Sequence, residues 1–174
     1  SLTVPIFVNR NYSLPNWVNS NSLVIASSYS GNTEETLSAY HEAISKGAKV
    51  IGVTTGGKLA SLLDKNNNEK VLIPAGLQPR AAVAFSFIPL LYLLKKLSVT
   101  NSKALDELDA TIEKIQSIND IYSIDNEKNP TYALAKEIYR TIPVIYGENE
   151  LTSTIALRWK GQFCENSKML AYHN

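Results

Sequence analysis

The sequence predicts an α/β fold, with three layers in which a parallel sheet is flanked by helices. Three observations predict it. Several short apolar runs lack the polar alternation of half-exposed strands, as expected for parallel strands that are buried on both faces. Stretches with an apolar stripe of helical period separate these runs, and glycine or small polar residues connect the two kinds of segment. This alternation of strand and helix is typical of right-handed parallel crossovers.

The first half of the chain supplies most of this pattern. A weak apolar run at 6–8 is followed by better strand candidates. The expected strands are residues 23–27, 50–54 and 71–73, and the expected helices are 34–46, 59–63 and 81–96. Gly47 is a typical helix stop, and Gly56 with Gly57 turns the chain after the second strand. The last of these helices is the most apolar, and we expect it to be buried.

The pattern restarts after a polar interruption. An amphipathic helix is expected at 101–118, and the Asn-, Asp- and Ser-rich stretch after it is typical of a linker. Beyond it we expect helices at 133–140 and 151–162, and strands at 142–146 and from 169 onward. The predicted organisation is therefore a first domain at 1–118, a linker at 119–131 and the beginning of a second, similar domain at 132–174. Because the chain begins with Ser1 and not with methionine, we expect it to be a segment of a longer protein.

Composition narrows the function classes. The net charge of the 174 residues is +1, so no broad basic surface is expected to attract nucleic acid or anionic lipid. Cys164 is the only cysteine, which excludes an internal disulfide and agrees with a cytoplasmic location. No apolar run reaches the length of about 18 residues that a membrane span needs. Histidines and carboxylates lack metal-ligand spacing, so we expect no metal and no cofactor.

The stretch SSYSGNTEET at 27–36 joins the first good strand to the next helix. Asn32 is the expected helix N-cap, with Glu35 completing a capping box. A helix start offers backbone N–H groups and a positive dipole end to an anion, and Ser28, Ser30 and Thr33 add hydroxyl donors. This pattern indicates a phosphate monoester held by neutral donors, although an ordinary capped turn has the same composition. Neither G-x-x-x-x-G-K-[ST] nor a G-x-G-x-x-G after a strand is present, so nucleotide binding has little support.

Residues 28–36, SYSGNTEET, resemble the signature S-x-S-G-x-T-x-E-[ST] of SIS (sugar isomerase) domains. Three further stretches narrow the match: VPIFVNR at 4–10, QPRAA at 78–82, and LRWKGQ at 157–162 followed by ENSK at 165–168. Together they resemble the bifunctional phosphoglucose/phosphomannose isomerases. The resemblance implies a flavodoxin-like SIS fold and the interconversion of glucose 6-phosphate and mannose 6-phosphate with fructose 6-phosphate. It also implies a phosphorylated hexose as substrate and a homodimer with two SIS domains in each chain.

Two residues take catalytic roles by this resemblance. Glu165 corresponds to the base that moves a proton between C1 and C2 through an enediol, and Arg80 to the arginine near the enediolate. Without the resemblance, Glu165 would be read as a solvated loop acid. Arg80 would be read as a charge at a helix end, although a cation is unfavourable at a helix N-terminus. The family's ring-opening histidine is expected beyond Asn174, and His173 is expected to be a strand-end residue without that role.

Two other functions fit parts of the pattern. A non-catalytic phosphosugar-binding regulator would need only Ser28, Ser30 and Thr33, but such regulators usually carry a helix-turn-helix, and the sequence contains none. The isomerase half of a glucosamine 6-phosphate synthase would need a lysine and histidine set that is not found here. Cys164 next to Glu165 has no histidine partner that would make it a nucleophile.

Overall fold

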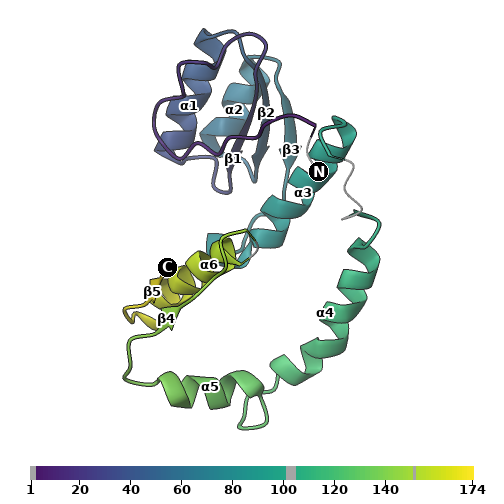
Figure 1. The fold of residues 1–174 in the computed structure, drawn as a ribbon. Coiled ribbons are helices and arrows are strands. Elements are labelled where there is room, and N and C mark those ends of the chain that lie inside the picture. The colour runs from purple at the N-terminus through teal and green to yellow at the C-terminus, as the bar shows by residue number, and fades with distance from the viewer. Residues whose placement is uncertain (1–2, 101–104, 151) are drawn as a thin grey trace. The chain divides into compact units, whose positions relative to one another are not determined.

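The computed structural model describes residues 3–100, 105–150 and 152–174 (Figure 1). The chain divides into two compact units, Ser1–Asp106 and Glu107–Asn174. Each unit combines helices with parallel strands, which confirms the predicted α/β class.

The first unit is built on a three-stranded parallel sheet of β1 (Leu23–Ser28), β2 (Lys49–Thr54) and β3 (Glu69–Leu72), in the order β1-β2-β3. Ala26 pairs with Gly52, and Gly52 pairs with Lys70. Because the three strands are parallel and adjacent, the loops that follow them leave the same edge of the sheet.

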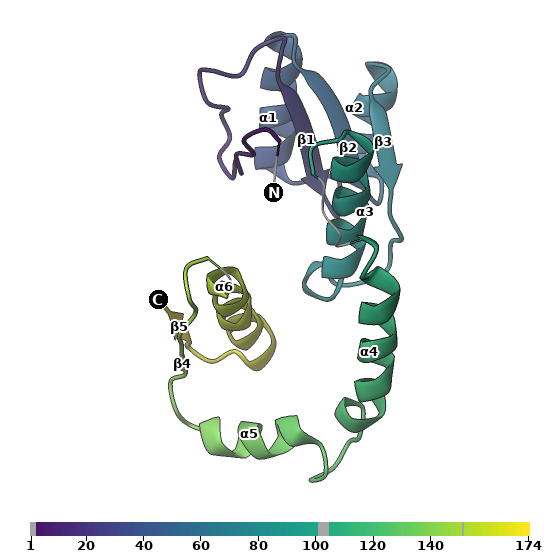
Figure 2. The same cartoon turned by 45° about the vertical axis from the view of Figure 1, so that its right-hand side comes forward.

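Helices α1 (Glu34–Ser45) and α2 (Gly57–Lys65) cover one face of this sheet, and α3 (Val83–Lys96) lies against the other (Figure 2). The core lies mainly under α1 and α2; its buried members are Leu14, Val18, Ala26, Tyr40, Ala43, Ala48, Val50, Leu59 and Leu63. A Cβ at Gly52 would lie 2.1 Å from Leu63 Cδ1, so the missing side chain of Gly52 lets α2 pack close to β2. These contacts produce the predicted three-layer arrangement.

Helix α1 ends as the sequence predicts. Gly47 has a φ of 69° and its N–H donates to Ile44 O, while the N–H of Ala48 donates to Ala43 O. Such a left-handed glycine with reversed hydrogen bonds is a common C-terminal stop.

Residues 6–8, which were not among the expected strands, form no strand. Two expectations for the first unit are wrong. The N-cap of α1 is Thr33 and not Asn32, and the Thr33 side chain makes no capping bond. The Asn32 side chain instead contacts Ser30 O and the N–H of Lys58. Helix α3 has no buried residue, since it is apolar on more sides than the sheet covers. A 3-10 turn, η1 (Pro79–Ala81), precedes α3.

The second unit contains α4 (Leu108–Tyr122), α5 (Pro130–Ile138), α6 (Ser153–Gln162) and two short parallel strands, β4 (Val144–Ile145) and β5 (Tyr172–His173). A π-helical turn, η3 (Phe163–Ser167), follows α6. The start of the helix expected at 101–118 includes residues 101–104, which lie outside the described part of the chain. Helix α5 is capped by Asn129, whose side chain accepts a hydrogen bond from the N–H of Thr131 at 2.9 Å. Among the described residues, no helix is both long and apolar enough to cross a membrane.

Candidate functional site

The loop between β1 and α1 brings together the hydroxyl residues that the sequence singled out. Ser28 is the last residue of β1 and is 5% exposed, whereas Ser30 and Thr33 are exposed. The hydroxyl oxygens of Ser28 and Thr33 lie 2.8 Å apart, within hydrogen-bonding distance. The N–H of Gly31 donates to the Ser28 hydroxyl oxygen at 3.1 Å. The loop therefore curls around Ser28 and places two hydroxyls side by side at the start of a helix.

The helix start itself adds backbone donors. The first intrahelical bond of α1 runs from the N–H of Leu37 to Thr33 O at 3.0 Å. The N–H groups of residues 34–36 precede that bond, so they have no acceptor within the helix. Such groups, together with the positive end of the helix dipole, favour a bound anion.

The β2–α2 loop supports this first loop from the neighbouring strand. Gly31 has a φ of 69°, and a Cβ there would lie 1.9 Å from Gly56 O and 2.9 Å from Thr54 Oγ1. Gly31 O accepts the N–H of Leu59 at 2.9 Å. Sequence reasoning treated Gly56 and Gly57 only as a turn and missed this role. The order of the strands could have suggested it, because loops after neighbouring parallel strands leave the sheet side by side.

Two side chains complete the attachment. The Asn32 amide oxygen accepts the N–H of Lys58 at 3.1 Å, and its amide nitrogen donates to Ser30 O at 3.2 Å. The Thr55 hydroxyl donates to Tyr29 O at 2.7 Å, and the Thr55 N–H donates to the same oxygen at 3.0 Å. The backbone of the β1–α1 loop is thus fixed along most of its length.

Two carboxylates in the first turn of α1 oppose an anion at the helix start. The Tyr12 hydroxyl donates to Glu34 Oε2 at 3.4 Å, which places the Glu34 carboxylate beside the coil that precedes β1. The negative charge of Glu35 is the largest cause of the raised pKa of Tyr12, followed by desolvation and the charge of Glu34. Both glutamates therefore lie close enough to act on Tyr12 electrostatically.

Arg80 lies in η1, between β3 and α3, in the same unit as the hydroxyl loop. It is half-buried, and Pro79 occupies the first position of the turn, where its fixed φ is favourable. The proline therefore fixes the chain just before the arginine. The segment that carries Arg80 follows β3, so this segment leaves the sheet at the same edge as the β1–α1 loop.

Glu165 belongs to the second unit and lies in the π-helical turn η3 at the end of α6. It is exposed, and the turn ends at Lys168, which has a left-handed φ of 54°. Single π-turns at helix ends are rare and are often found at functional sites. The helix expected at 151–162 corresponds to α6, and Glu165 follows it in η3.

The remaining candidates have structural surroundings. His173 lies in β5, as expected of a strand-end residue, and its Nδ1 is 2.6 Å from Asn174 O. His41 is exposed on α1. Cys164 is half-buried in η3. Within the described ranges, no group of three His, Cys, Asp or Glu side chains is placed to hold a metal.

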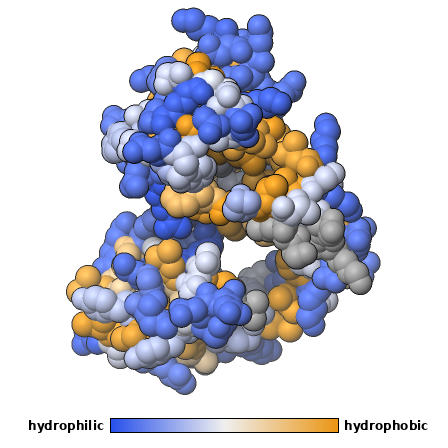
Figure 3. All heavy atoms as spheres, turned by 45° about the horizontal axis from the view of Figure 1, so that its top comes forward, coloured by the Kyte–Doolittle hydropathy of each residue, from blue (hydrophilic) through white to orange (hydrophobic). Residues whose placement is uncertain are grey.

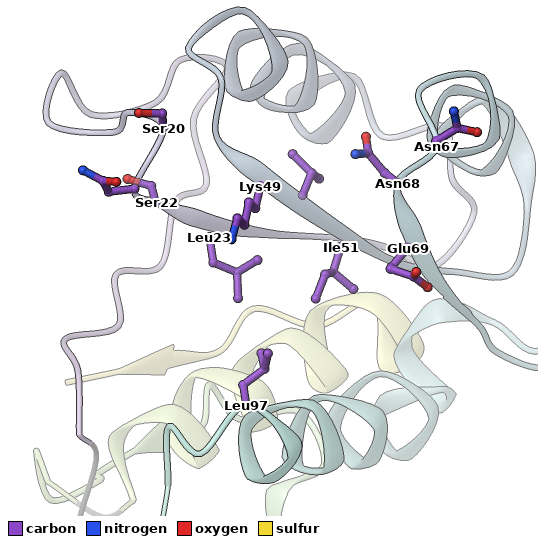
Figure 4. A pocket seen from close by; sticks show the side chains of 11 residues that line it. Ser20, Ser22, Leu23, Lys49, Ile51, Asn67, Asn68, Glu69 and Leu97 are labelled. Atoms are coloured by element: carbon purple, nitrogen blue, oxygen red, sulfur yellow. The ribbon is translucent and has the colours of Figure 1, made fainter.

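Two hollows flank the first unit. One of about 630 Å³ lies at the amino ends of the strands, where Leu23, Ile51 and Leu97 point into the same space and polar side chains form the rim (Figure 4). Ligands of open parallel sheets bind at the carboxyl ends of the strands, so this hollow is on the wrong edge for a substrate. The other, of about 920 Å³, lies between α1 and α2 and includes Asn32 and Lys58, next to the hydroxyl loop.

Comparisons with known proteins find relatives of this chain over nearly its whole length. Residues 127–174 match the family model described as the bacterial phospho-glucose isomerase C-terminal SIS domain. The chain is 49% identical over 173 residues to the bifunctional phosphoglucose/phosphomannose isomerase of Caldicellulosiruptor bescii, covering 98% of this chain and 51% of that protein. It is 43% identical over 174 residues to the protein of the same name from Thermoplasma acidophilum, covering 98% of this chain and 50% of that protein. Over nearly its whole length, the chain is therefore similar to bifunctional phosphoglucose/phosphomannose isomerases.

The fold of this chain is also found in solved structures of sugar-phosphate isomerases. The structure of tagatose-6-phosphate ketose/aldose isomerase from Escherichia coli matches with a TM-score of 0.60 at 15% identity, covering 91% of this chain and 44% of that one. At this identity the match establishes the fold alone. The chain spans about half the length of the curated relatives it matches.

Proposed function

We propose that the full-length protein is an aldose–ketose isomerase that interconverts glucose 6-phosphate and mannose 6-phosphate with fructose 6-phosphate. The observation that carries the proposal is the β1–α1 loop, which presents paired hydroxyls and helix-start amides at the carboxyl edge of the sheet in a chain similar to these isomerases. In this proposal, Ser28, Ser30 and Thr33 hold the sugar phosphate. An entering phosphoryl oxygen can accept a hydrogen bond from one hydroxyl of the Ser28–Thr33 pair while the pair keeps its own hydrogen bond.

The proposed reaction moves one proton from C2 to C1 and a second proton from the C2 hydroxyl to the C1 oxygen, and it needs no cofactor. Glu165 removes the proton from C2 of the open-chain aldose and returns it to C1. The negative charge that develops on the enediolate oxygen is stabilised by the guanidinium of Arg80, a fixed cation that stays protonated. The net oxidation state of the sugar is unchanged, because C1 is reduced as C2 is oxidised.

Further proposals concern organisation. We propose residues 1–118 as one SIS domain, 119–131 as a linker and 132–174 as the start of a second; the two compact units and the match over 127–174 support two domains. We also propose a cytoplasmic homodimer. Exposed apolar residues on α3, including Phe87 and Tyr92, which are 53% and 54% exposed, support a protein contact there. Figure 3 shows apolar atoms gathered over a wide area of the first unit. Sedimentation of the full-length protein measures its mass in solution, which should be twice the mass of one chain.

A coupled assay of the full-length protein with glucose 6-phosphate and mannose 6-phosphate tests the function. We expect Glu165→Gln to lower kcat by about 10²–10⁴-fold, the usual contribution of a general base. Glu137→Gln, which alters another exposed glutamate of the second unit, is the matched control and should leave kcat unchanged. Full turnover by Glu165→Gln removes this residue as the base. A wild-type protein that binds the sugar phosphate without turnover would instead be a regulatory SIS module.

A further inference from the structure

Tyr29 is the one large side chain within the stretch of small residues at 27–33. Its carbonyl oxygen is held by Thr55, as described above, so its backbone is fixed from the β2–α2 side. Its side chain leads to the next strand. The Tyr29 hydroxyl donates to Pro74 O at 3.1 Å and accepts the N–H of Leu77 at 3.1 Å. One phenol therefore joins two points of a segment that lies 45 and 48 residues further along the chain.

The segment that Tyr29 holds leads directly to Arg80. Residues 74–78 have no regular secondary structure, are exposed, and include Gly76 with a φ of 100° and open space around it. Such a segment has little packing of its own to fix its course. Leu77 is three residues before Arg80, and Pro79 stiffens the chain between them. The position of the arginine therefore depends on where Leu77 is held.

We propose that Tyr29 is a positioning residue, which fixes Arg80 at a set distance from the phosphate-binding loop. The inference rests on the proposed function. The bonds of a sugar phosphate determine how far C1 and C2 lie from its phosphate group. Arg80 must therefore be held at a matching distance from the loop that binds the phosphate. The Tyr29 hydroxyl can fix this distance, because Tyr29 belongs to the loop and its hydroxyl is hydrogen-bonded to the segment that carries Arg80.

Tyr29→Phe in the full-length protein tests the inference. Phenylalanine keeps the ring and the backbone contact with Thr55 but removes both hydrogen bonds to 74–77. We expect kcat to fall roughly tenfold and KM to change less than about twofold, because a small misplacement of a positioned group costs rate more than binding. Tyr122→Phe, at an exposed position of α4, is the control and should behave as the wild type.

A double variant separates positioning from a general structural effect. If Tyr29 acts through Arg80, Tyr29→Phe should have no further effect on kcat in an Arg80→Met background. Amide hydrogen exchange of residues 74–82 should also be faster in Tyr29→Phe than in Tyr122→Phe. An active wild type with an unchanged kcat in Tyr29→Phe, or additive effects of the two substitutions, refutes the inference alone. A wild type without turnover refutes the proposed function, and the role of Tyr29 falls with it.

Discussion

Replacing Gly31 by alanine should destabilise the first unit more than the same change at Gly47. Both glycines have a φ of 69°, so both substitutions impose the same left-handed strain, about 1–2 kcal/mol. The surroundings differ. At Gly47 the nearest atom to the new Cβ is Ser20 Cβ at 3.6 Å, an ordinary contact, whereas at Gly31 it is the backbone oxygen of Gly56 at 1.9 Å.

The backbone of the β2–α2 loop must move to admit a Cβ at Gly31, and overpacking of this kind typically costs about 1–3 kcal/mol more. We therefore expect a total loss of about 2–5 kcal/mol for Gly31→Ala, against about 1–2 kcal/mol for Gly47→Ala. Urea unfolding of the full-length variants, with the slope m checked for constancy, measures the difference. Binding of glucose 6-phosphate should weaken only in Gly31→Ala. Equal losses of stability in the two variants would show that the close approach of the two loops has no energetic weight.

Two further predictions concern stability. The N–H of Leu14 donates to Glu42 Oε2 at 2.7 Å and is the largest cause of the lowered pKa of Glu42; Lys46 also lowers it. Because the folded-state pKa lies below the ordinary value of 4.5, this carboxylate stabilises the fold above that pH, and the effect is lost as the pH falls through the folded pKa. Glu42→Gln should therefore show a smaller loss of urea midpoint than the wild type on acidification over that range, and equal losses would contradict this assignment. Leu63 is fully buried beside Gly52, and Leu63→Ala should lower the free energy of unfolding by about 2–5 kcal/mol in the same urea experiment. A loss below about 1 kcal/mol would mean that α2 closes over the cavity.

The sequence was sufficient to predict the sheet and most helices of the first unit. The apolar runs at β1 and β2 lack the alternation of apolar and polar residues that half-exposed strands have. Gly47 marks a helix end, because it has a left-handed conformation that other residues rarely adopt. Contacts between segments distant in the chain could not be predicted in this way. Asparagine is a common N-cap residue, but the Asn32 side chain instead accepts a hydrogen bond from the N–H of Lys58 in the neighbouring loop. The apolar content of α3 likewise does not reveal which of its sides the sheet covers.

The same limit explains why the motif residues alone do not describe the site. Ser28, Ser30 and Thr33 are recognisable because they are close together in the chain. Gly31 is needed because another loop approaches it, and that loop is adjacent only through the pairing of β1 with β2. A single sequence therefore reveals the groups that contact a ligand more easily than the distant residues that hold those groups in place.

The order of the strands makes a long side chain necessary at position 29. The hydroxyl loop follows β1, its support follows β2 and the segment with Arg80 follows β3. Adjacent strands lie about 4.8 Å apart, so the first and third loops leave the sheet roughly 10 Å from each other. No serine or threonine can cross that interval, whereas a tyrosine can reach across the β2 loop and still offer both a donor and an acceptor. Its hydroxyl meets both Pro74 and Leu77, which is the arrangement expected if the distance between phosphate and arginine must be held constant.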